Sequence, residues 1–457
     1  MPYIPAVRRW VLCVLAAMAP TRARADGVSI AGGSPRAIGR AGAAVVGDDG
    51  GGALLINPAA MARRDTTRVQ VGVAVVEGDV RWQTDAEGAP LSRGQAGSRL
   101  APLGAVVTAA GDWVLGIGAM TSAISARSLA RPGDIRGDLY STYDYRYAGI
   151  AGSYRRDTLA FGVARRLGDS LALGVSLGAS RLSVSEHRRI WAGFAGRESI
   201  GDPKSDVDLV LTGTDRLSES AVAGVLYAPD DTPIELGASV AWARRVTIDG
   251  SVTAVGGEPP SPTIEQSTGS AASLDVRQPL TVRAGGRYVG DRIAAELDGD
   301  LWIAPASAES AVWTVRGLGV IDPSGVEAAI PRVPSRISQH THAALRVAVD
   351  VELIPGFLRA TCGYALSTPG TQAARLSPSF GDLGGHTLGL GLESTASGFT
   401  VTLGWSRTWS LATAAPTALR LDNPFAGGDG PVFSGTYDGS LDQIGVLLEL
   451  ELGHASK

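Results

Sequence analysis

Lysine and cysteine are nearly absent from this chain of 457 residues. Almost every basic residue is an arginine, and the two cysteines are Cys13 and Cys362. Cys13 lies in an apolar N-terminal stretch and lacks the small residues that precede a lipoprotein cysteine, which argues against a lipid anchor. We expect this stretch to be removed, so that only Cys362 remains and no disulfide can form within the mature chain.

Charge and long apolar runs are also scarce. Charged residues make up 19% of the chain, and no apolar run long enough for a transmembrane helix follows the N-terminal stretch. Removal of residues 1–25 takes four arginines from the 41 basic residues and leaves all 45 acidic residues, so the expected net charge is −8. This excess of acidic residues argues against a nucleic-acid partner.

Residues 1–25 have the organisation of a signal peptide. Arg8 and Arg9 precede an apolar core at residues 10–19, and Ala23-Arg24-Ala25 before Asp26 has the small-x-small pattern of a cleavage site. The core is shorter than the ~20 residues that a spanning helix needs. The arginine pair also fits twin-arginine export, but a membrane barrel must be exported unfolded, which favours the general secretory route.

The pattern that is present is an alternation of large apolar residues with small or polar ones. Leu171, Leu173, Val175 and Leu177, for example, alternate with residues such as Ser176. Short turns join pairs of these segments at residues 111–112, 168–169, 230–231, 290–291, 355–356 and 397–398. Long connections separate the pairs, at residues 78–99, 123–142, 188–218, 249–276, 304–339, 367–384 and 409–438. This organisation predicts an all-β fold, an antiparallel transmembrane β-barrel of about 14 strands with short periplasmic turns and long outer loops.

Turn length determines which residues face each other across a hairpin. A two-residue turn at Gly290-Asp291 would place Val289 opposite Arg292 and Arg283 opposite Asp298, with the last pair in the lumen. Such pairs would either face an anionic head group or a plug, or solvate the lumen wall and pair with each other. The predicted lumen polar pairs are Arg283–Asp298 and Glu352–Arg359.

Residues 26–65 do not alternate and are rich in glycine and alanine. A segment of this kind before a closed sheet is either a flexible periplasmic tail or a plug inside the lumen, where glycine-rich backbone can follow a narrow space. The predicted organisation is a signal peptide at 1–25, an N-terminal tail or plug at 26–65, a transmembrane barrel at 66–452 and a C-terminal tail at 453–457.

Several short blocks, in a fixed order after the signal peptide, resemble a known family. They are Gly39-Arg40-Ala41, Asp48-Asp49, Asn57-Pro58-Ala59, residues 168–174, residues 291–302 and Gly435-Thr436-Tyr437. Together they are similar to the FadL-type outer-membrane long-chain fatty-acid transporter family, over most of residues 27–452. One departure is the end of the last strand, Leu450-Glu451-Leu452, where the family usually has a terminal aromatic residue that the barrel-assembly machinery reads.

The resemblance implies a passive uptake channel for long-chain fatty acids or similar hydrophobic compounds in the Gram-negative outer membrane. It implies that residues 26–65 are an N-terminal hatch that plugs the lumen, with ligand capture at outer loops and sideways release at a kinked third strand. Gly116 and Gly118 in that strand either permit the bend or make room for the hatch. The expected partners are outer-membrane lipid, lipopolysaccharide and the assembly machinery, and the expected state is a monomer. The hatch or gating residues are Arg40, Asp48, Asp49, Asn57, Pro58 and Ala59.

The third outer loop contains an apolar cluster of Ile190, Trp191 and Phe194. An exposed patch of this type suggests capture of a hydrophobic ligand, and packing between loops is the alternative.

Catalytic and metal-binding motifs are weak. Residues 174–178 match the nucleophile elbow of hydrolases, but alternation runs through Ser176 with no helix after it. His340 and His342 share one strand face, and no third ligand is positioned near them. We therefore expect neither an enzyme nor a metal or cofactor site. The alternatives to an uptake channel are a structural or secretion-associated barrel and a general porin with an open lumen.

Overall fold

The computed structural model describes most of the chain beyond the predicted signal peptide. Among the residues that it describes, no helix has the length and apolar character needed to cross a membrane. The described residues are 30–84, 92–95, 98–129, 147, 149–193, 203–256, 263–309, 311–321, 325–377, 379–415, 423–425 and 435–454.

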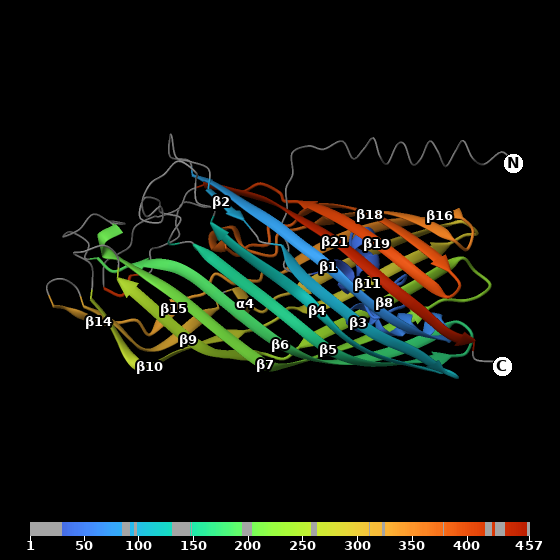
Figure 1. The fold of residues 1–457 in the computed structure, drawn as a ribbon, viewed down its shortest axis with the longest axis horizontal. Helices are drawn as coiled ribbons and strands as arrows, with labels where there is room; N and C mark the ends of the chain where they lie inside the picture. Colours follow the sequence, from blue (N-terminus) through green and yellow to red (C-terminus); the bar gives the residue numbers. More distant parts are fainter. Residues whose placement is uncertain are drawn as a thin grey trace.

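Fourteen strands pair antiparallel around a closed ring, so the predicted barrel of about 14 strands is confirmed (Figure 1). Pairing of the first strand with the last, β1 with β21, closes the ring. In order around the wall the strands are β1 (Thr66–Thr84), β3 (Arg99–Ala110), β4 (Trp113–Leu129), β5 (Ala151–Leu167), β6 (Leu171–Trp191), β7 (Asp206–Tyr227), β8 (Ile234–Ala243), β11 (Leu280–Val289), β12 (Ile293–Ile303), β16 (His342–Ile354), β17 (Leu358–Ser367), β18 (Gly385–Ala396), β19 (Phe399–Trp409) and β21 (Gly435–His454).

The two faces of the wall follow from the alternation in the sequence. On β6 the outward Leu177 is 62% exposed, whereas the neighbouring Ser176 is 3% exposed and faces the lumen. On β1 the outward Val71 is 61% exposed and Ala74 is buried. Large apolar side chains therefore form an outer band that suits a lipid environment. Exposed aromatic residues lie beside the short turns at Trp113, Tyr227, Tyr288 and Phe399.

The short turns differ in length, and this corrects one predicted register. Ser397 and Gly398 form a two-residue turn, with φ of 50° and 79° as a type I′ turn requires. The turn at Gly290 is longer, because the Gly290 N–H donates to the Ile293 carbonyl and Val289 pairs with Ala294. The prediction of Val289 opposite Arg292 is therefore wrong. A shift by an even number of residues keeps every side chain on its predicted face.

Parts of several predicted long loops are strands instead, including residues 206–218 of the loop predicted at 188–218, which belong to β7. Residues 249–276 and 304–339 contribute to a sheet that extends outward from β7, at the left in Figure 1. A tilted strand of ~9–11 residues crosses the membrane, but strands continue beyond it here because an apolar layer covers them. The outer strands are β9 (Val246–Gly256), β10 (Thr263–Val276), β13 (Val312–Ile321), β14 (Glu327–Ala329) and β15 (Arg332–Pro334), with β2 (Ser92–Gln95) and β20 (Thr413–Ala415) elsewhere on the rim.

Buried apolar side chains of β6, β7 and these outer strands make a separate core, which we call the outer core. Its members include Leu182, Leu209, Ile248, Leu274, Trp313 and Val333. Short helical turns lie at the rim in α4 (Ala306–Glu309), η5 (Pro203–Ser205) and η6 (Ala373–Arg375).

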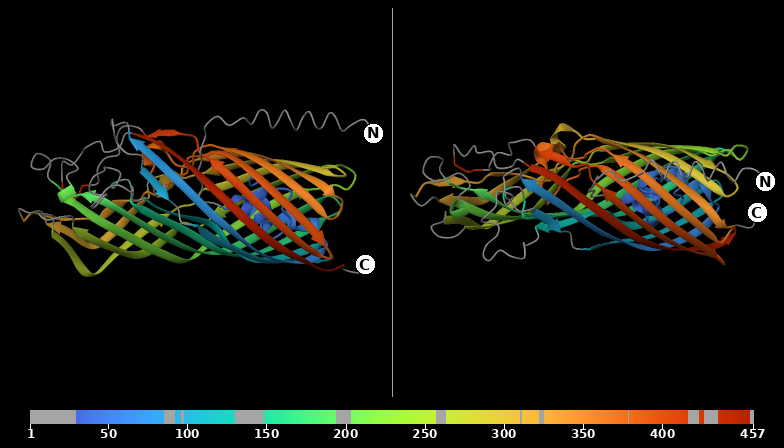
Figure 2. Two further views of the ribbon diagram at one scale, coloured as in Figure 1. Left: turned by 45° about the horizontal axis from the view of Figure 1, so that its top comes forward. Right: turned by 90° about the horizontal axis from the view of Figure 1, so that it is seen from above.

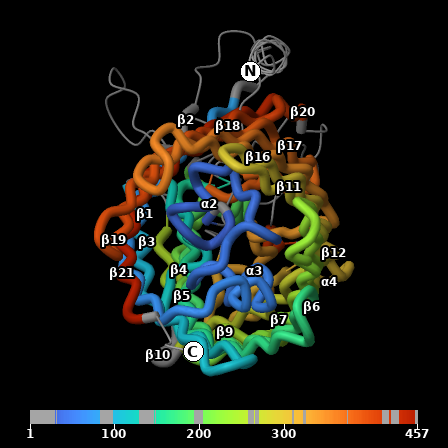
Figure 3. Tube along the Cα trace, turned by 90° about the vertical axis from the view of Figure 1, so that its right-hand side faces the viewer, coloured from blue at the N-terminus to red at the C-terminus, as the bar shows by residue number. Residues whose placement is uncertain are grey.

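Residues 30–63, which we call the lumen segment, fold inside the barrel (Figures 2 and 3). Seen from the turn end, the ring of strands surrounds them. The segment fits because parts of it touch the wall backbone to backbone: a Cβ on Gly39 would lie 2.8 Å from the Gly391 Cα of β18. Its helices are η1 (Ala31–Gly33), α2 (Pro35–Gly39), α3 (Ala53–Ile56) and η2 (Pro58–Arg63).

Candidate functional site: the lumen segment and the cavity beside it

Arg40 joins the lumen segment to the barrel wall through buried charges. Its guanidinium donates to the Glu296 carboxylate of β12 and lies 3.6 Å from the Asp350 carboxylate of β16. Burial alone would lower the pKa of Arg40, but these carboxylates outweigh it and raise the pKa above the ordinary arginine value. Arg40 therefore stays charged where it is buried, and removing it would leave the two carboxylates with Arg287 alone, 3.9 Å from Glu296 and 3.6 Å from Asp350.

Asp48 and Asp49 are neighbours in opposite electrostatic environments. The Asp49 carboxylate lies 2.9 Å from both Arg64 and Arg68 and 3.2 Å from Arg36. Burial favours its neutral form, yet the three guanidiniums hold the pKa of Asp49 well below its usual range. Burial raises the pKa of Asp48, whose carboxylate accepts a 2.7 Å hydrogen bond from the Ser34 hydroxyl. Asp49 is therefore held by three cations, whereas Asp48 is held by the Ser34 hydroxyl.

Carboxylates of β12 also hold the backbone of the lumen segment. Asp298 accepts hydrogen bonds from the Ala44 and Val45 N–H groups at 2.8 and 3.0 Å, and Glu296 accepts from Val46 and Gly47 at 2.8 and 3.1 Å. Irregular backbone inside a barrel needs such partners, because its N–H groups have no helix or strand to pair with.

These contacts correct the prediction that Asp298 pairs with Arg283. Arg283 lies opposite Asp300, 3.8 Å away, because the hairpin turn is longer than two residues. The other predicted pair, Glu352 and Arg359, does lie face to face, 3.2 Å apart, and Arg359 also lies 3.3 Å from Glu393.

Asn57 ties the second half of the lumen segment to the first half and to the wall. Its side-chain amide donates to the Val45 carbonyl at 2.9 Å and to the Val225 carbonyl of β7 at 3.2 Å. Its Oδ1 accepts from the Ala59 N–H and so caps η2, with Pro58 in the first turn. The backbone at Ala59 packs against Gly174 of β6, where an added Cβ would lie 2.3 Å from the Ala59 nitrogen.

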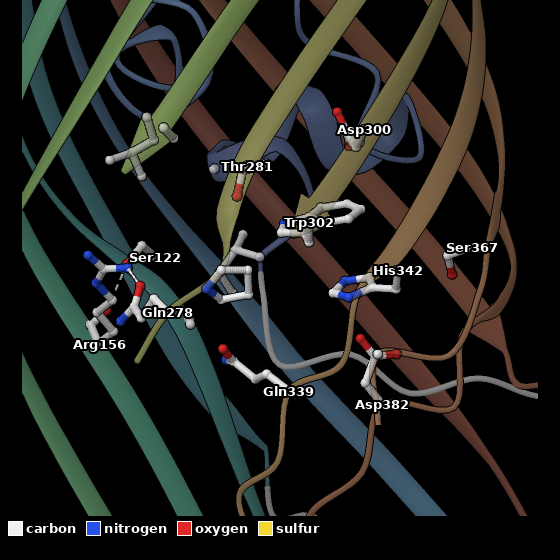
Figure 4. Close-up of a pocket in the computed structure, with 18 of the residues that line it drawn as sticks. Ser122, Arg156, Gln278, Thr281, Asp300, Trp302, Gln339, His342, Ser367 and Asp382 are labelled. Atoms are coloured by element: carbon white, nitrogen blue, oxygen red, sulfur yellow. Dashed lines mark hydrogen bonds between the residues drawn. The ribbon is translucent and has the colours of Figure 1, made fainter. Parts of the chain in front are cut away.

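A cavity of about 360 Å³ lies between the lumen segment and the outer loops (Figure 4). Ile30, Leu55 and Ile56 of the segment contribute apolar surface to it. Gln339 and Asp382 come from the connections that precede β16 and β18. Burial raises the pKa of the Asp382 carboxyl, which favours its neutral form.

One wall of the cavity carries a chain of polar and aromatic contacts. Arg346 of β16 donates to Asp300 at 2.7 Å and to the Ala41 carbonyl of the lumen segment at 2.9 Å. Its guanidinium lies 5.9 Å from the centre of the Trp302 ring, and Trp302 stacks on His342 at 4.5 Å. Arg346 is therefore in contact with both the cavity wall and the segment.

The third strand of the wall, β4, separates from its neighbour partway along. It pairs with β3 only from Trp113 to Met120, and its outer residues pair with β5 after a register shift between Thr121 and Ala123. Gly116 and Gly118, the predicted position of the bend, pair regularly on both sides and lie against Leu54 of the segment. The irregularity therefore falls beyond the two glycines.

The predicted capture cluster is buried rather than exposed. Ile190 and Trp191 are 2% and 0% exposed, because they end β6 opposite Val207 and Asp206 of β7 and Ile190 joins the outer core. Phe194 lies outside the described residues. The prediction of an exposed apolar patch is wrong for the two residues that are described, because they pack between the outer ends of strands instead.

The weaker motifs occupy structural positions. Ser176 lies in the middle of β6, and its hydroxyl donates to the Leu54 carbonyl, so it is not in a nucleophile elbow. His342 begins β16 and His340 precedes it, with the His340 N–H donating to the Gly370 carbonyl. In the described ranges, no group of three or more metal-binding side chains is placed to hold an ion.

Arg68, Trp302 and Arg346 were missed by sequence reasoning. The signal for Arg346 and Asp350 was available, because Arg346 lies between Leu345 and Val347 and Asp350 lies between Val349 and Val351. A charged residue inside an apolar strand of a barrel faces the lumen, and the plug is one of the few partners it can have there.

A closed antiparallel barrel with an apolar outer band and its own N-terminal residues in the lumen defines an outer-membrane-type channel protein. A family model described as outer membrane protein transport protein (OMPP1/FadL/TodX) matches residues 16–296, and the chain belongs to this family. Solved structures share the fold. No curated protein matches the chain by sequence.

Three of these structures are similar over nearly the whole chain. A Pseudomonas aeruginosa FadL homologue is 14% identical with a TM-score of 0.73, covering 94% of this chain and 100% of its own. The Pseudomonas putida toluene transporter TodX is 14% identical with a TM-score of 0.61, over 89% of this chain and 95% of its own. The Ralstonia pickettii toluene transporter TbuX is 12% identical with a TM-score of 0.64, over 92% and 98%.

Proposed function

We propose that the chain is a passive channel that takes up hydrophobic compounds, long-chain fatty acids or similar, across the Gram-negative outer membrane. The observation that carries the proposal is the cavity of about 360 Å³ between the outer loops and the lumen segment. Its apolar surface from Ile30, Leu55 and Ile56 offers a place for an apolar chain. Burial of each methylene contributes roughly 0.8 kcal/mol, so a long chain can leave water without energy input.

The lumen segment acts as a hatch in this proposal. Its apolar residues Val45, Leu54 and Met61 are buried against the wall, and its charged residues Arg40 and Asp49 are paired there. Ligand in the cavity therefore cannot continue towards the turn end while the segment stays docked. The break between β3 and β4 beyond Met120 supports a sideways exit into the membrane, since Ile30 of the segment donates to the Ser122 carbonyl at that point.

The test is uptake by cells that express either the full chain or a variant that lacks residues 30–58. Radiolabelled oleate should enter with the full chain at a rate that saturates, and the deletion should change this rate. In planar bilayers the full chain should be silent and the deletion should conduct. Unchanged oleate uptake in a folded deletion variant contradicts the hatch, and a large ohmic conductance of the full chain favours a general porin instead.

A further inference from the structure

Two arginines face each other on the outside of the barrel wall. The pairing of β6 with β7 shifts by one residue between Ser180 and Leu182. Arg181 therefore lies opposite two residues of β7, Arg216 and Leu217, and all three side chains are exposed. Neighbouring residues of a regular strand point to opposite faces, so this β-bulge is what turns an arginine and a leucine outward together. Like charges directly opposite each other destabilise a sheet, so the bulge is costly unless an anion lies between the two arginines.

The acidic side chains on the neighbouring strands do not match the arginines in number. Outward charged residues there form three ion pairs, Arg155–Asp157, Arg244–Glu219 and Arg245–Asp275 (Figure 1). The exposed residues that remain are Arg181, Arg216 and Arg277 against Asp249, and none of the four is in an ion pair within the described ranges. Three arginines against one carboxylate leave an excess of positive charge on this part of the wall.

The arginine pair lies where the apolar band of the wall ends. Arg181 comes ten residues after Leu171, the first residue of β6, and a tilted strand crosses the membrane in ~9–11 residues. The outward side chains just below it are large and apolar: Leu177 is 62% exposed and Trp242 of β8 is 53% exposed. Leu217, 60% exposed, continues this apolar surface up to the arginines. The positive charge is therefore at the height of lipid head groups, directly above a surface for acyl chains.

The outer end of the wall has the reverse charge on another side. At β1 and β21 the outward Glu77 lies opposite Asp442, and Asp79 lies opposite Ser440. Four carboxylates outnumber two arginines in this region, which contains Glu77, Asp79, Asp438, Asp442, Arg81 and Arg407. The excess of positive charge is therefore local to the wall around β6 and β7 and is not a general property of the outer rim.

We propose that Arg181 and Arg216 bind a phosphate of the phosphorylated glycolipid in the outer leaflet, lipopolysaccharide, whose acyl chains lie on Leu177, Leu217 and Trp242. The planar fork of an arginine matches two oxygens of a phosphate, and two forks side by side match its two negative charges. A phosphate between the arginines replaces their repulsion by two ion pairs. This inference rests on the outer-membrane location in the proposed function, but not on passage of any ligand through the lumen.

The test compares two lipid probes on the full barrel in non-ionic detergent, by native mass spectrometry of the retained lipid. One probe is lipid A with both phosphates, and the other is the same lipid after both phosphates have been removed. The wild type should bind the phosphorylated lipid roughly 10- to 100-fold more tightly, the range expected for hydrogen bonds between charged groups. The double variant Arg181→Gln, Arg216→Gln should lose this preference. Arg407→Gln should keep it and is the matched control, since Arg407 is 41% exposed on β19 and lies 3.6 Å from Asp442.

Two results would overturn the lipid site: equal binding of the two lipids to the wild type, or a preference that survives in the double variant. Inorganic phosphate is a third probe, and complete displacement of lipid A by millimolar phosphate would show a phosphate site without a lipid. If the double variant does not fold, Arg181→Gln and Arg216→Gln are tested singly, and heat-dependent migration in electrophoresis identifies a folded barrel. Oleate uptake should be the same in the double variant and the wild type, so failure of the channel function and failure of the lipid site are distinguishable.

Discussion

The lumen and the outer core are two interiors of one barrel, and they are built from opposite chemistry. In the lumen, buried charges such as Arg40, Asp49 and Arg68 hold the segment to the wall. In the outer core, apolar side chains such as Leu209 and Trp313 pack with 0% exposure. Buried ion pairs add little net stability over apolar packing but impose a strict geometry. The contrast indicates a lumen that is built for defined docking and an outer core that is built to stay closed.

The largest expected effect comes from breaking the charge network in the lumen. Asp49→Asn leaves Arg36, Arg64 and Arg68 without their shared carboxylate, and Arg68 is 1% exposed. Loss of one partner from a buried pair costs about 3–5 kcal/mol, here in the free energy that docks the segment. Hydrogen exchange of residues 44–56 should accelerate, while thermal unfolding of the barrel changes little.

The matched control for that substitution is Asp65→Asn, because Asp65 is exposed just outside the segment. Equal exchange rates in the two variants would show that the network does not hold the segment.

The outer core should be destabilised by the loss of a buried apolar side chain, whereas the lumen network is sensitive to the loss of a charge. Leu209→Ala removes a side chain with 0% exposure and should cost about 3 kcal/mol, the usual range for a buried leucine. The loss should appear as faster proteolysis of the outer sheet, with exchange of the lumen segment unchanged. Leu217→Ala on the same strand is the control, since Leu217 is 60% exposed. Faster exchange in the segment would mean that the two interiors are coupled.

A smaller effect is expected at Asn57, where one amide joins two parts of the segment and β7. Asn57→Ala removes the cap of η2 and two bonds to carbonyls, and should cost about 1–2 kcal/mol of docking. Asn423→Ala is the counterpart in the outer region, where the amide donates to the Gly193 carbonyl. Exchange of residues 44–63 should accelerate only in the first variant. The same acceleration in both variants would show that docking of the segment does not depend specifically on Asn57.

The smallest effect is a pH dependence that arises from Asp48. Its pKa is raised in the folded protein by burial, so its contribution to docking is complete below the unfolded pKa of about 3.9 and is lost as pH rises through the folded value. Acidification towards the unfolded pKa should therefore strengthen docking, while Asp49, whose pKa is lowered, keeps its charge. Hydrogen exchange followed from pH 7 down to about 4, corrected for the intrinsic rate, measures this. Asp48→Asn should reduce the pH dependence, and a docking strength that falls on acidification would reverse the assignment.

The faces of the strands were predictable, because alternation is a local property of the sequence. Leu177 outward and Ser176 inward follow from period two alone. The partner of Arg283 was not predictable in the same way, since the dipeptide Gly290-Asp291 does not reveal that the turn closes through Ile293. A register shift by an even number of residues keeps each side chain on its face of the sheet but changes its cross-strand partner. Arg283 was therefore assigned to the correct side of the wall and to the wrong carboxylate.

The contacts of the lumen segment and the outer core depend on packing between distant elements. Nothing near Glu296 in the sequence indicates that it accepts from Val46 and Gly47. Ile190 and Trp191 read as exposed loop residues, because the strands that bury them lie in regions expected to be loops. An apolar cluster in an outer loop therefore needs its cross-strand partners before it can be interpreted as a surface.

The link between the lumen segment and the barrel has a kinetic consequence. η2 ends at Arg63 and β1 begins at Thr66, so only two residues join the segment to a strand that also closes the ring against β21. A tether this short keeps the undocked segment at a high effective concentration beside its own binding surface. Each release should therefore be followed by rapid redocking, and passage of ligand would occur in brief openings that reset without any external energy.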